Sequence, residues 1–131
     1  MLLMFLHLSA VNPNITVNLT GVTTVNQGLV ELNKAFPDWE HNYQVNEFDC
    51  SEQSALVYEY FKCAGLEPEL KLGYDWPHKY GHAWVVCQGK TIECMELRVA
   101  TNQTFYDHFN PFKYYSQAER DGDLDWWNSG Y

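Results

Sequence analysis

The chain has 131 residues, of which 46% are hydrophobic and 19% are charged, and this composition predicts a single folded domain over residues 1–131. Eight Lys and Arg residues against 17 Asp and Glu residues give a net charge of −9. This balance argues against a nucleic-acid partner, because the chain offers few basic side chains to neutralise phosphates. The sequence contains no apolar run of about 18 residues, so no membrane span is expected.

Residues 1–24 are expected to form an N-terminal arm or an edge strand, because residues 11–24 are polar and rich in β-branched side chains. The apolar stretch Met1–Ala10 ends in small residues, which is typical either of a secretory signal or of an ordinary strand. The compartment is therefore left open. The features that favour export are this stretch and the N-x-[ST] sequons at Asn14, Asn18 and Asn102.

Two helices are predicted after the arm. Apolar residues recur at helical spacing over residues 25–36, and Pro37 ends this short amphipathic segment. The clearest element is a helix over about Cys50–Ala64, which carries a broad apolar face. Asp49 is a good N-cap for this helix, and Gly65 is the residue type expected just past its end.

Strands follow the second helix. Glu69–Tyr74 is a short one, while His82–Cys87 and Lys90–Met95 flank the dipeptide Gln88-Gly89. This arrangement predicts a β-hairpin with a two-residue turn. Helices followed by antiparallel strands indicate an α+β fold, with the helices packed on a small antiparallel sheet.

The residues with chemical potential lie on these elements. Cys50 falls in the first turn of the predicted helix, where unpaired N–H groups and the helix dipole favour a thiolate. A thiolate hydrolase also needs a base and a group that orients it, and His82 is the candidate base. With a two-residue turn, Glu93 becomes the diagonal neighbour of His82, their Cβ atoms roughly 7–8 Å apart. A turn of odd length would instead place Glu96 on the His82 face.

The segments FDCSEQSALVYEYFKCAGLEPELKLGY and GHAWVVCQGKTIECM resemble the transglutaminase-like cysteine peptidase superfamily, which shares a papain-like Cys-His-acid triad. The resemblance covers about residues 47 to 96. It implies that Cys50 is the nucleophile, His82 of GHAW is the base and Glu93 is the acid. The family's acid is commonly Asp followed by Pro, whereas this chain has Glu93-Cys94. The implied fold is a transglutaminase-like or papain-like core with the nucleophile at a helix N-terminus.

Further residues complete the expected site. Gln44 and Tyr43 are oxyanion candidates beside the backbone N–H of Cys50. Trp84 is expected in the core or as a wall against the base, and Trp76 at the mouth of the cleft. The core of catalytic type then spans residues 25–100, followed by an aromatic and acidic C-terminal extension over residues 101–131. We also expect the thiol and the imidazole to form a thiolate–imidazolium pair.

The leading hypothesis is a thiol-dependent acyl-transfer enzyme that uses a Cys-His-Glu triad and no cofactor. Its substrate would be a peptide or protein with an amide carbonyl, and hydrolysis is favoured over transfer to an amine. A non-catalytic binding module with the same fold is the alternative. A redox or metal protein is the third hypothesis, although no cysteine pair has C-x-x-C spacing. A disulfide and the oligomeric state are left open.

Overall fold

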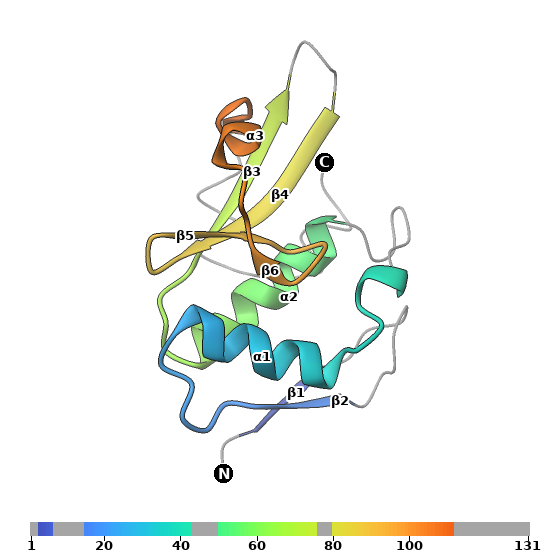
Figure 1. Ribbon diagram of the computed structural model, residues 1–131, viewed down its shortest axis with the longest axis vertical. Helices are drawn as coiled ribbons and strands as arrows, with labels where there is room; N and C mark the ends of the chain where they lie inside the picture. Colours follow the sequence, from blue (N-terminus) through green and yellow to red (C-terminus); the bar gives the residue numbers. More distant parts are fainter. Residues whose placement is uncertain (1–2, 7–14, 43–49, 76–79, 112–131) are drawn as a thin grey trace.

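The computed structural model describes residues 3–6, 15–42, 50–75 and 80–111. It shows an α+β fold with helices packed against an antiparallel sheet (Figure 1). In chain order the elements are β1 (Leu3–Leu6), β2 (Ile15–Asn18), α1 (Val25–Ala35), a 3₁₀ helix η1 (Glu40–Asn42), α2 (Cys50–Cys63), β3 (Glu69–Asp75), β4 (Tyr80–Cys87), β5 (Lys90–Glu93), β6 (Arg98–Val99), α3 (Gln103–Asp107) and β7 (Asn110–Pro111).

The main sheet has five antiparallel strands in the order β6-β5-β4-β3-β7, and β1 and β2 form a separate pair. The turn between β4 and β5 confirms the predicted hairpin. Gln88 and Gly89 have φ angles of 52° and 73°, the pair of positive values that a type I′ turn requires. Cys87 consequently pairs with Lys90, and the register has the parity expected from the sequence.

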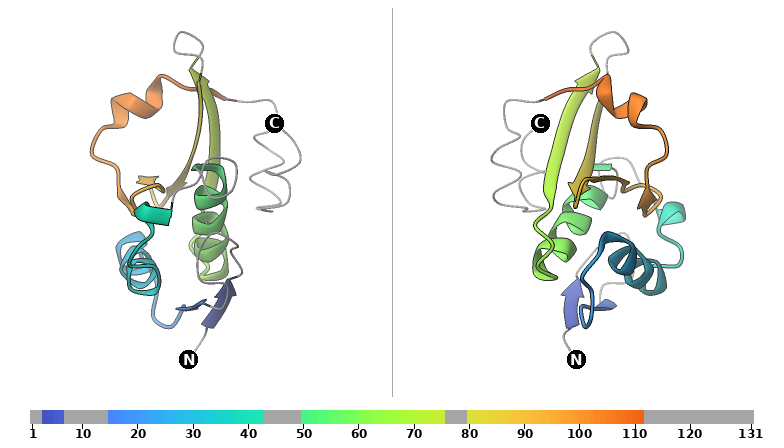
Figure 2. Two further views of the ribbon diagram at one scale, coloured as in Figure 1. Left: turned by 90° about the vertical axis from the view of Figure 1, so that its right-hand side faces the viewer. Right: turned by 60° about the vertical axis from the view of Figure 1, so that its left-hand side comes forward.

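The sheet carries apolar groups on both faces. Successive side chains of β4 point to opposite faces, and both sets include apolar residues. One face of the sheet packs into the main core with α1 and α2, and the other packs against α3. Figure 2 shows α3 and α2 on different sides of the long strand pair. The first face of β4 presents Ala83, Val85 and Cys87, and the second presents His82, Trp84 and Val86.

The C-terminal end of α2 is formed as predicted. Gly65 has a φ of 82°, a conformation that glycine adopts without strain. Its N–H donates to the carbonyl of Lys62, and the N–H of Leu66 donates to the carbonyl of Phe61, both at 3.0 Å. This pattern is a Schellman motif, which satisfies carbonyls that the helix itself leaves open. The predicted N-cap, Asp49, lies outside the described residues.

Helix α1 begins with a capping box that sequence analysis missed. The Thr24 side chain accepts from the Gln27 N–H, and the Gln27 side chain accepts from the Thr24 N–H. Gly28 allows α1 to lie very close to α2, since a Cβ at this position would stand 2.4 Å from the ring of Phe61. Packing between the two helices therefore requires a residue without a side chain here.

Two segments expected to lie beside the core are part of it. In the N-terminal arm, Val17, Leu19 and Val22 are buried in the main core, and Leu3–Leu6 form a strand. In the C-terminal extension, the helix α3 and the short strand β7 close the second face of the sheet. Sequence analysis assigned no element to residues 101–111, because their aromatic clusters show neither a period of 2 nor one of 3.6.

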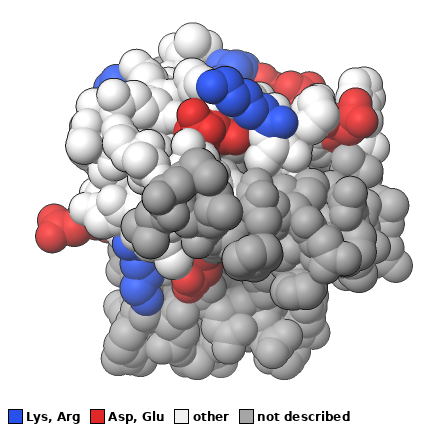
Figure 3. Space-filling model, turned by 90° about the horizontal axis from the view of Figure 1, so that it is seen from below, with Lys and Arg blue, Asp and Glu red and all other residues white. Residues whose placement is uncertain are grey.

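Charged side chains of both signs are mixed on the described surface. Lys34 lies 3.5 Å from Glu31, and Lys71 lies 2.9 Å from Glu69. Figure 3 shows one face on which basic side chains stand next to acidic ones. None of the described helices is long and apolar enough to cross a membrane.

Candidate active site

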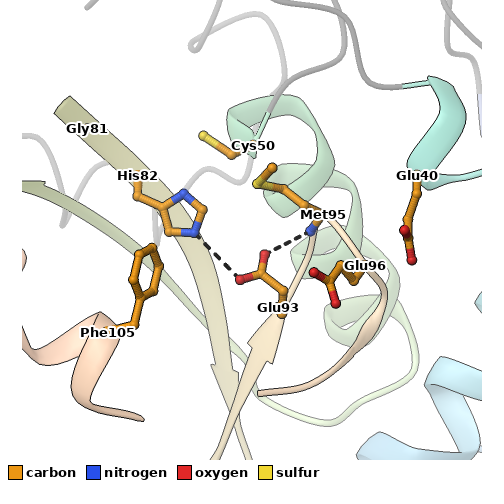
Figure 4. A pocket seen from close by; sticks show the side chains of 8 residues that line it. All are labelled: Glu40, Cys50, Gly81, His82, Glu93, Met95, Glu96 and Phe105. Atoms are coloured by element: carbon orange, nitrogen blue, oxygen red, sulfur yellow. Dashed lines mark hydrogen bonds and ion pairs between the residues drawn. The ribbon is translucent and has the colours of Figure 1, made fainter. Parts of the chain in front are cut away.

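A cavity of about 450 Å³ brings together residues from five parts of the chain (Figure 4). Cys50 enters it from the first turn of α2, His82 from the sheet on β4, and Glu93 from the end of β5. These are the three residues that the sequence proposed as a triad. The full lining among the described residues is Glu40, Cys50, Gly81, His82, Glu93, Met95, Glu96 and Phe105.

Glu93 is the carboxylate that faces His82. Its Oε2 atom lies 3.9 Å from Nε2 of His82, and its Oε1 atom accepts a hydrogen bond of 3.2 Å from the N–H of Met95. The hydroxyl of Tyr106 donates to Oε2 of Glu93 as well. Glu96, the other candidate acid, forms an ion pair with Arg98 and is 42% exposed. The two-residue turn decides this choice, since it brings Glu93 and not Glu96 to the imidazole.

His82 is 5% exposed and lies within a cluster of aromatic rings. Burial lowers its pKa because the protonated form loses its hydration, and the negative charge of Glu93 acts in the opposite direction. The net direction of the pKa is downward, which favours the neutral imidazole. This revises the expected thiolate–imidazolium pair. Among the described residues, the rings within 6.0 Å of the imidazole, centroid to centroid, are those of Trp84, Phe105, Tyr106 and Phe109.

The buried neutral His82 predicts a loss of stability in mild acid. Its folded pKa lies below the unfolded value of about 6.5, so the unfolded chain binds the proton more readily. The contribution of neutral His82 to the free energy of unfolding is fully present above pH 6.5 and is lost as the pH falls through the folded pKa. One such proton costs at most about 1.4 kcal/mol per pH unit. Urea unfolding between pH 7.5 and 5 should therefore show a steeper decline for the wild type than for His82→Gln, and equal slopes would contradict the assignment.

The position of Cys50 follows from the start of α2. It is the first residue of a 14-residue helix, where the backbone N–H groups and the dipole favour an anion. One turn later, the Ser54 hydroxyl donates to the carbonyl of Ala83 at 2.9 Å, which ties this end of the helix to the residue beside His82. Cys50 itself is partly buried at the edge of the core.

The other three thiols lie in environments that oppose ionisation. Burial raises the pKa of Cys94, which is fully enclosed, and of Cys87, whose thiol donates to the carbonyl of Leu66. Cys63 is exposed, yet partial burial and the nearby charge of Glu59 raise its pKa too. All four cysteines are free thiols. Cys50 is thus distinguished from the rest by its helix position and its place in the cavity.

The remaining predicted residues divide into two groups. Trp84 stacks on the His82 ring with centroids 5.8 Å apart and does not line the cavity, so it forms a wall behind the imidazole. The oxyanion candidates Tyr43 and Gln44 lie outside the described residues, and so does Trp76.

Four residues at the site were missed by sequence reasoning. Tyr106 and Phe105 come from α3, Met95 from the turn after β5, and Glu40 from η1. The repeated aromatics of TFYDHF are a signal of packing, but nothing local indicates that they pack on His82. Their contacts with it span more than 20 residues along the chain.

The described residues contain no group of three or more His, Cys, Asp or Glu side chains arranged to hold a metal ion. Comparison with protein-family models, with curated proteins and with solved structures found no match for this chain.

Proposed function

We propose that this protein is a thiol-dependent acyl-transfer enzyme of transglutaminase-like type, with Cys50 as nucleophile, His82 as base and Glu93 as the orienting acid. The observation that carries the proposal is the shared cavity, which is lined by a helix-terminal thiol and a buried imidazole while a carboxylate faces the imidazole. Nucleophile, base and acid groups that converge on one cavity are the usual components of covalent catalysis.

The orientation of His82 supports a division of roles between its two nitrogens. Nε2 points toward Glu93, and Nδ1 lies on the other side of the ring, toward the side from which Cys50 enters (Figure 4). Glu93 then favours the tautomer that carries its proton on Nε2. In that tautomer Nδ1 carries no proton, so it can act as the acceptor of the thiol proton.

The reaction then proceeds in two stages. Cys50 Sγ attacks the substrate carbonyl carbon as Nδ1 of His82 takes the thiol proton, and a carbon–sulfur bond forms. The tetrahedral intermediate collapses, His82 gives that proton to the departing amine, and a thioester is left on Cys50. A water molecule, which loses a proton to His82, next attacks the thioester, and the carboxylic acid and the thiol are released. An amine in place of water would give transfer in place of hydrolysis.

The substrate class is a peptide or protein amide. A cavity of about 450 Å³ accepts a side chain and the adjoining amide more readily than a large folded surface. The apolar side chains of Met95 and Phe105 and the carboxylates of Glu40 and Glu96 lie around the reacting groups. Hydrolysis is the first expectation, and transfer to an amine is the second.

A non-catalytic binding module is the second candidate, and one observation favours it. The 3.9 Å between His82 and Glu93 exceeds hydrogen-bond length, and Glu93 is held by Tyr106 and Met95. A site in which Glu93 has only a structural role would show these same contacts.

Alkylation of the native protein by iodoacetamide separates the two candidates. If the site is catalytic, Cys50 should react faster than Cys63 between pH 6 and 7, although Cys63 is the more exposed thiol. Mass spectrometry of tryptic peptides gives both rates from one sample, and His82→Ala should slow only the first. Equal rates at the two cysteines, unchanged in His82→Ala, would favour the binding module.

The two neighbouring carboxylates offer a matched test of the acid. Glu93→Gln should lower the turnover of p-nitrophenyl acetate on the order of 10²-fold, because the amide no longer fixes the imidazole tautomer. The loss should be smaller than that in Cys50→Ala. Glu96→Gln removes an exposed carboxylate paired with Arg98 and should leave turnover within about twofold. The opposite ranking would show that Glu96 is the acid.

A further inference from the structure

We propose that Tyr106 is a positioning residue, whose hydroxyl fixes the carboxylate of Glu93 and so decides whether that carboxylate can form a hydrogen bond with His82. This inference rests on the proposed function for its catalytic meaning. The contacts between Tyr106, Glu93 and His82 are the same whether or not the protein is an enzyme.

The carboxylate of Glu93 is held at both oxygens. Oε1 accepts from the Met95 N–H at 3.2 Å, and Oε2 accepts from the Tyr106 hydroxyl. Oε2 is also the atom that faces Nε2 of His82, at 3.9 Å. Tyr106 and His82 are therefore two donors directed at the same oxygen, Oε2. In the structure only Tyr106 is close enough to form a hydrogen bond with it.

Tyr106 is well placed to act on Glu93, because its own position is fixed. Its side chain is 4% exposed, and its ring lies 5.3 Å from that of Trp84 and 5.1 Å from that of Phe105, centroid to centroid. Helix α3 is joined to β5 by a 2.7 Å hydrogen bond between Thr91 and Gln103. Burial and the bond to Glu93 raise the pKa of Tyr106, so its hydroxyl keeps the proton that it donates.

Among the described residues, charged groups on the side of His82 come from the cavity and from β3, where Lys71, paired with Glu69, and the buried Asp75 share its face of the sheet. The carboxylates in the cavity are Glu93 on β5, Glu96 after it and Glu40 on η1, and the thiol is Cys50 on α2. Glu96 is paired with Arg98, and the charge that acts on the imidazole is that of Glu93. A change in proton binding at His82 should therefore report the position of Glu93.

Loss of the Tyr106 hydroxyl should release Oε2 toward His82. A carboxylate that accepts from Nε2 stabilises the protonated imidazole more strongly than one at 3.9 Å. His82 in Tyr106→Phe should then bind a proton more tightly than in the wild type, while the ring contacts of position 106 are kept. Removing the charge with Glu93→Gln should act in the opposite direction.

The test is a nuclear magnetic resonance titration of the His82 ring in the full chain, with histidine labelled in the imidazole. We expect the midpoint of His82 to rise by about half a pH unit or more in Tyr106→Phe, roughly a threefold gain in proton affinity. The same substitution in a Glu93→Gln background should leave the midpoint where Glu93→Gln alone puts it. Tyr60→Phe is the matched control, because it removes another buried hydroxyl, one that donates to the carbonyl of Asn18 on β2.

An unchanged or lower midpoint in Tyr106→Phe would overturn the inference, and so would an equal shift in both backgrounds. If Tyr106→Phe does not fold, 3-fluorotyrosine introduced at position 106 keeps the ring and makes the hydroxyl a stronger donor. The midpoint of His82 should then fall, and an unchanged or higher midpoint would overturn the inference.

The outcome is separable from that of the proposed function. The titration needs no reactive thiol, so slow alkylation of Cys50 together with a coupled shift at His82 would refute the enzyme and keep the role of Tyr106. Fast alkylation of Cys50 with no coupled shift at His82 would support the enzyme and refute the role of Tyr106.

Discussion

Replacement of Cys50 with alanine is expected to lower the hydrolysis of p-nitrophenyl acetate by about 10³-fold or more. The physical reason is that the proposed mechanism forms its covalent intermediate on Cys50, and no other described cysteine lines the cavity beside His82. Cys50 is only partly buried, so the free energy of unfolding should change by less than about 1 kcal/mol. Stopped-flow absorbance measures the burst and the steady rate, and urea unfolding measures the stability.

The matched control for this change is Cys63→Ala, which removes an exposed thiol from the other end of the same helix. It should leave both the burst and the steady rate within about twofold of the wild type. A burst that survives in Cys50→Ala and disappears in Cys63→Ala would remove the proposed nucleophile.

Replacement of Trp39 with alanine is expected to cost about 3–5 kcal/mol of stability. Trp39 is buried, its indole N–H donates to the carbonyl of Cys94 at 2.6 Å, and its ring meets that of Phe36 edge to face at 5.2 Å. The side chain therefore joins the segment before η1 to the chain that follows Glu93. A loss of this size is a large share of the roughly 5–15 kcal/mol that holds a domain folded.

Two further variants test the source of this loss of stability, one at Trp39 and one as an exposed control. Trp39→Phe keeps most of the apolar bulk but leaves the carbonyl of Cys94 without its donor, so it should cost less than the alanine variant. Val30→Ala, on the exposed side of α1, should change the free energy of unfolding by less than about 0.5 kcal/mol. Urea unfolding followed by tyrosine and tryptophan fluorescence orders the three variants. A cost below 1 kcal/mol for Trp39→Ala would contradict the packing described.

Elements whose causes lie within a few residues were predictable from the sequence. Gly65 marks the end of α2 because the helix needs a residue at positive φ there. The dipeptide Gln88-Gly89 determines the two-residue turn, and the turn determines which acid faces His82. The position of Glu93 beside the imidazole follows from this turn.

The tertiary structure decided the surroundings of those residues. Residues 105–109 pack on His82 across more than 20 residues of chain, and no local period encodes which face of the sheet they cover. The resulting burial lowers the pKa of His82, and the hydroxyl of Tyr106 holds Glu93. Short-range sequence patterns determine which elements carry Cys50, His82 and Glu93, whereas the proton affinity of His82 depends on desolvation, which only the packed structure creates.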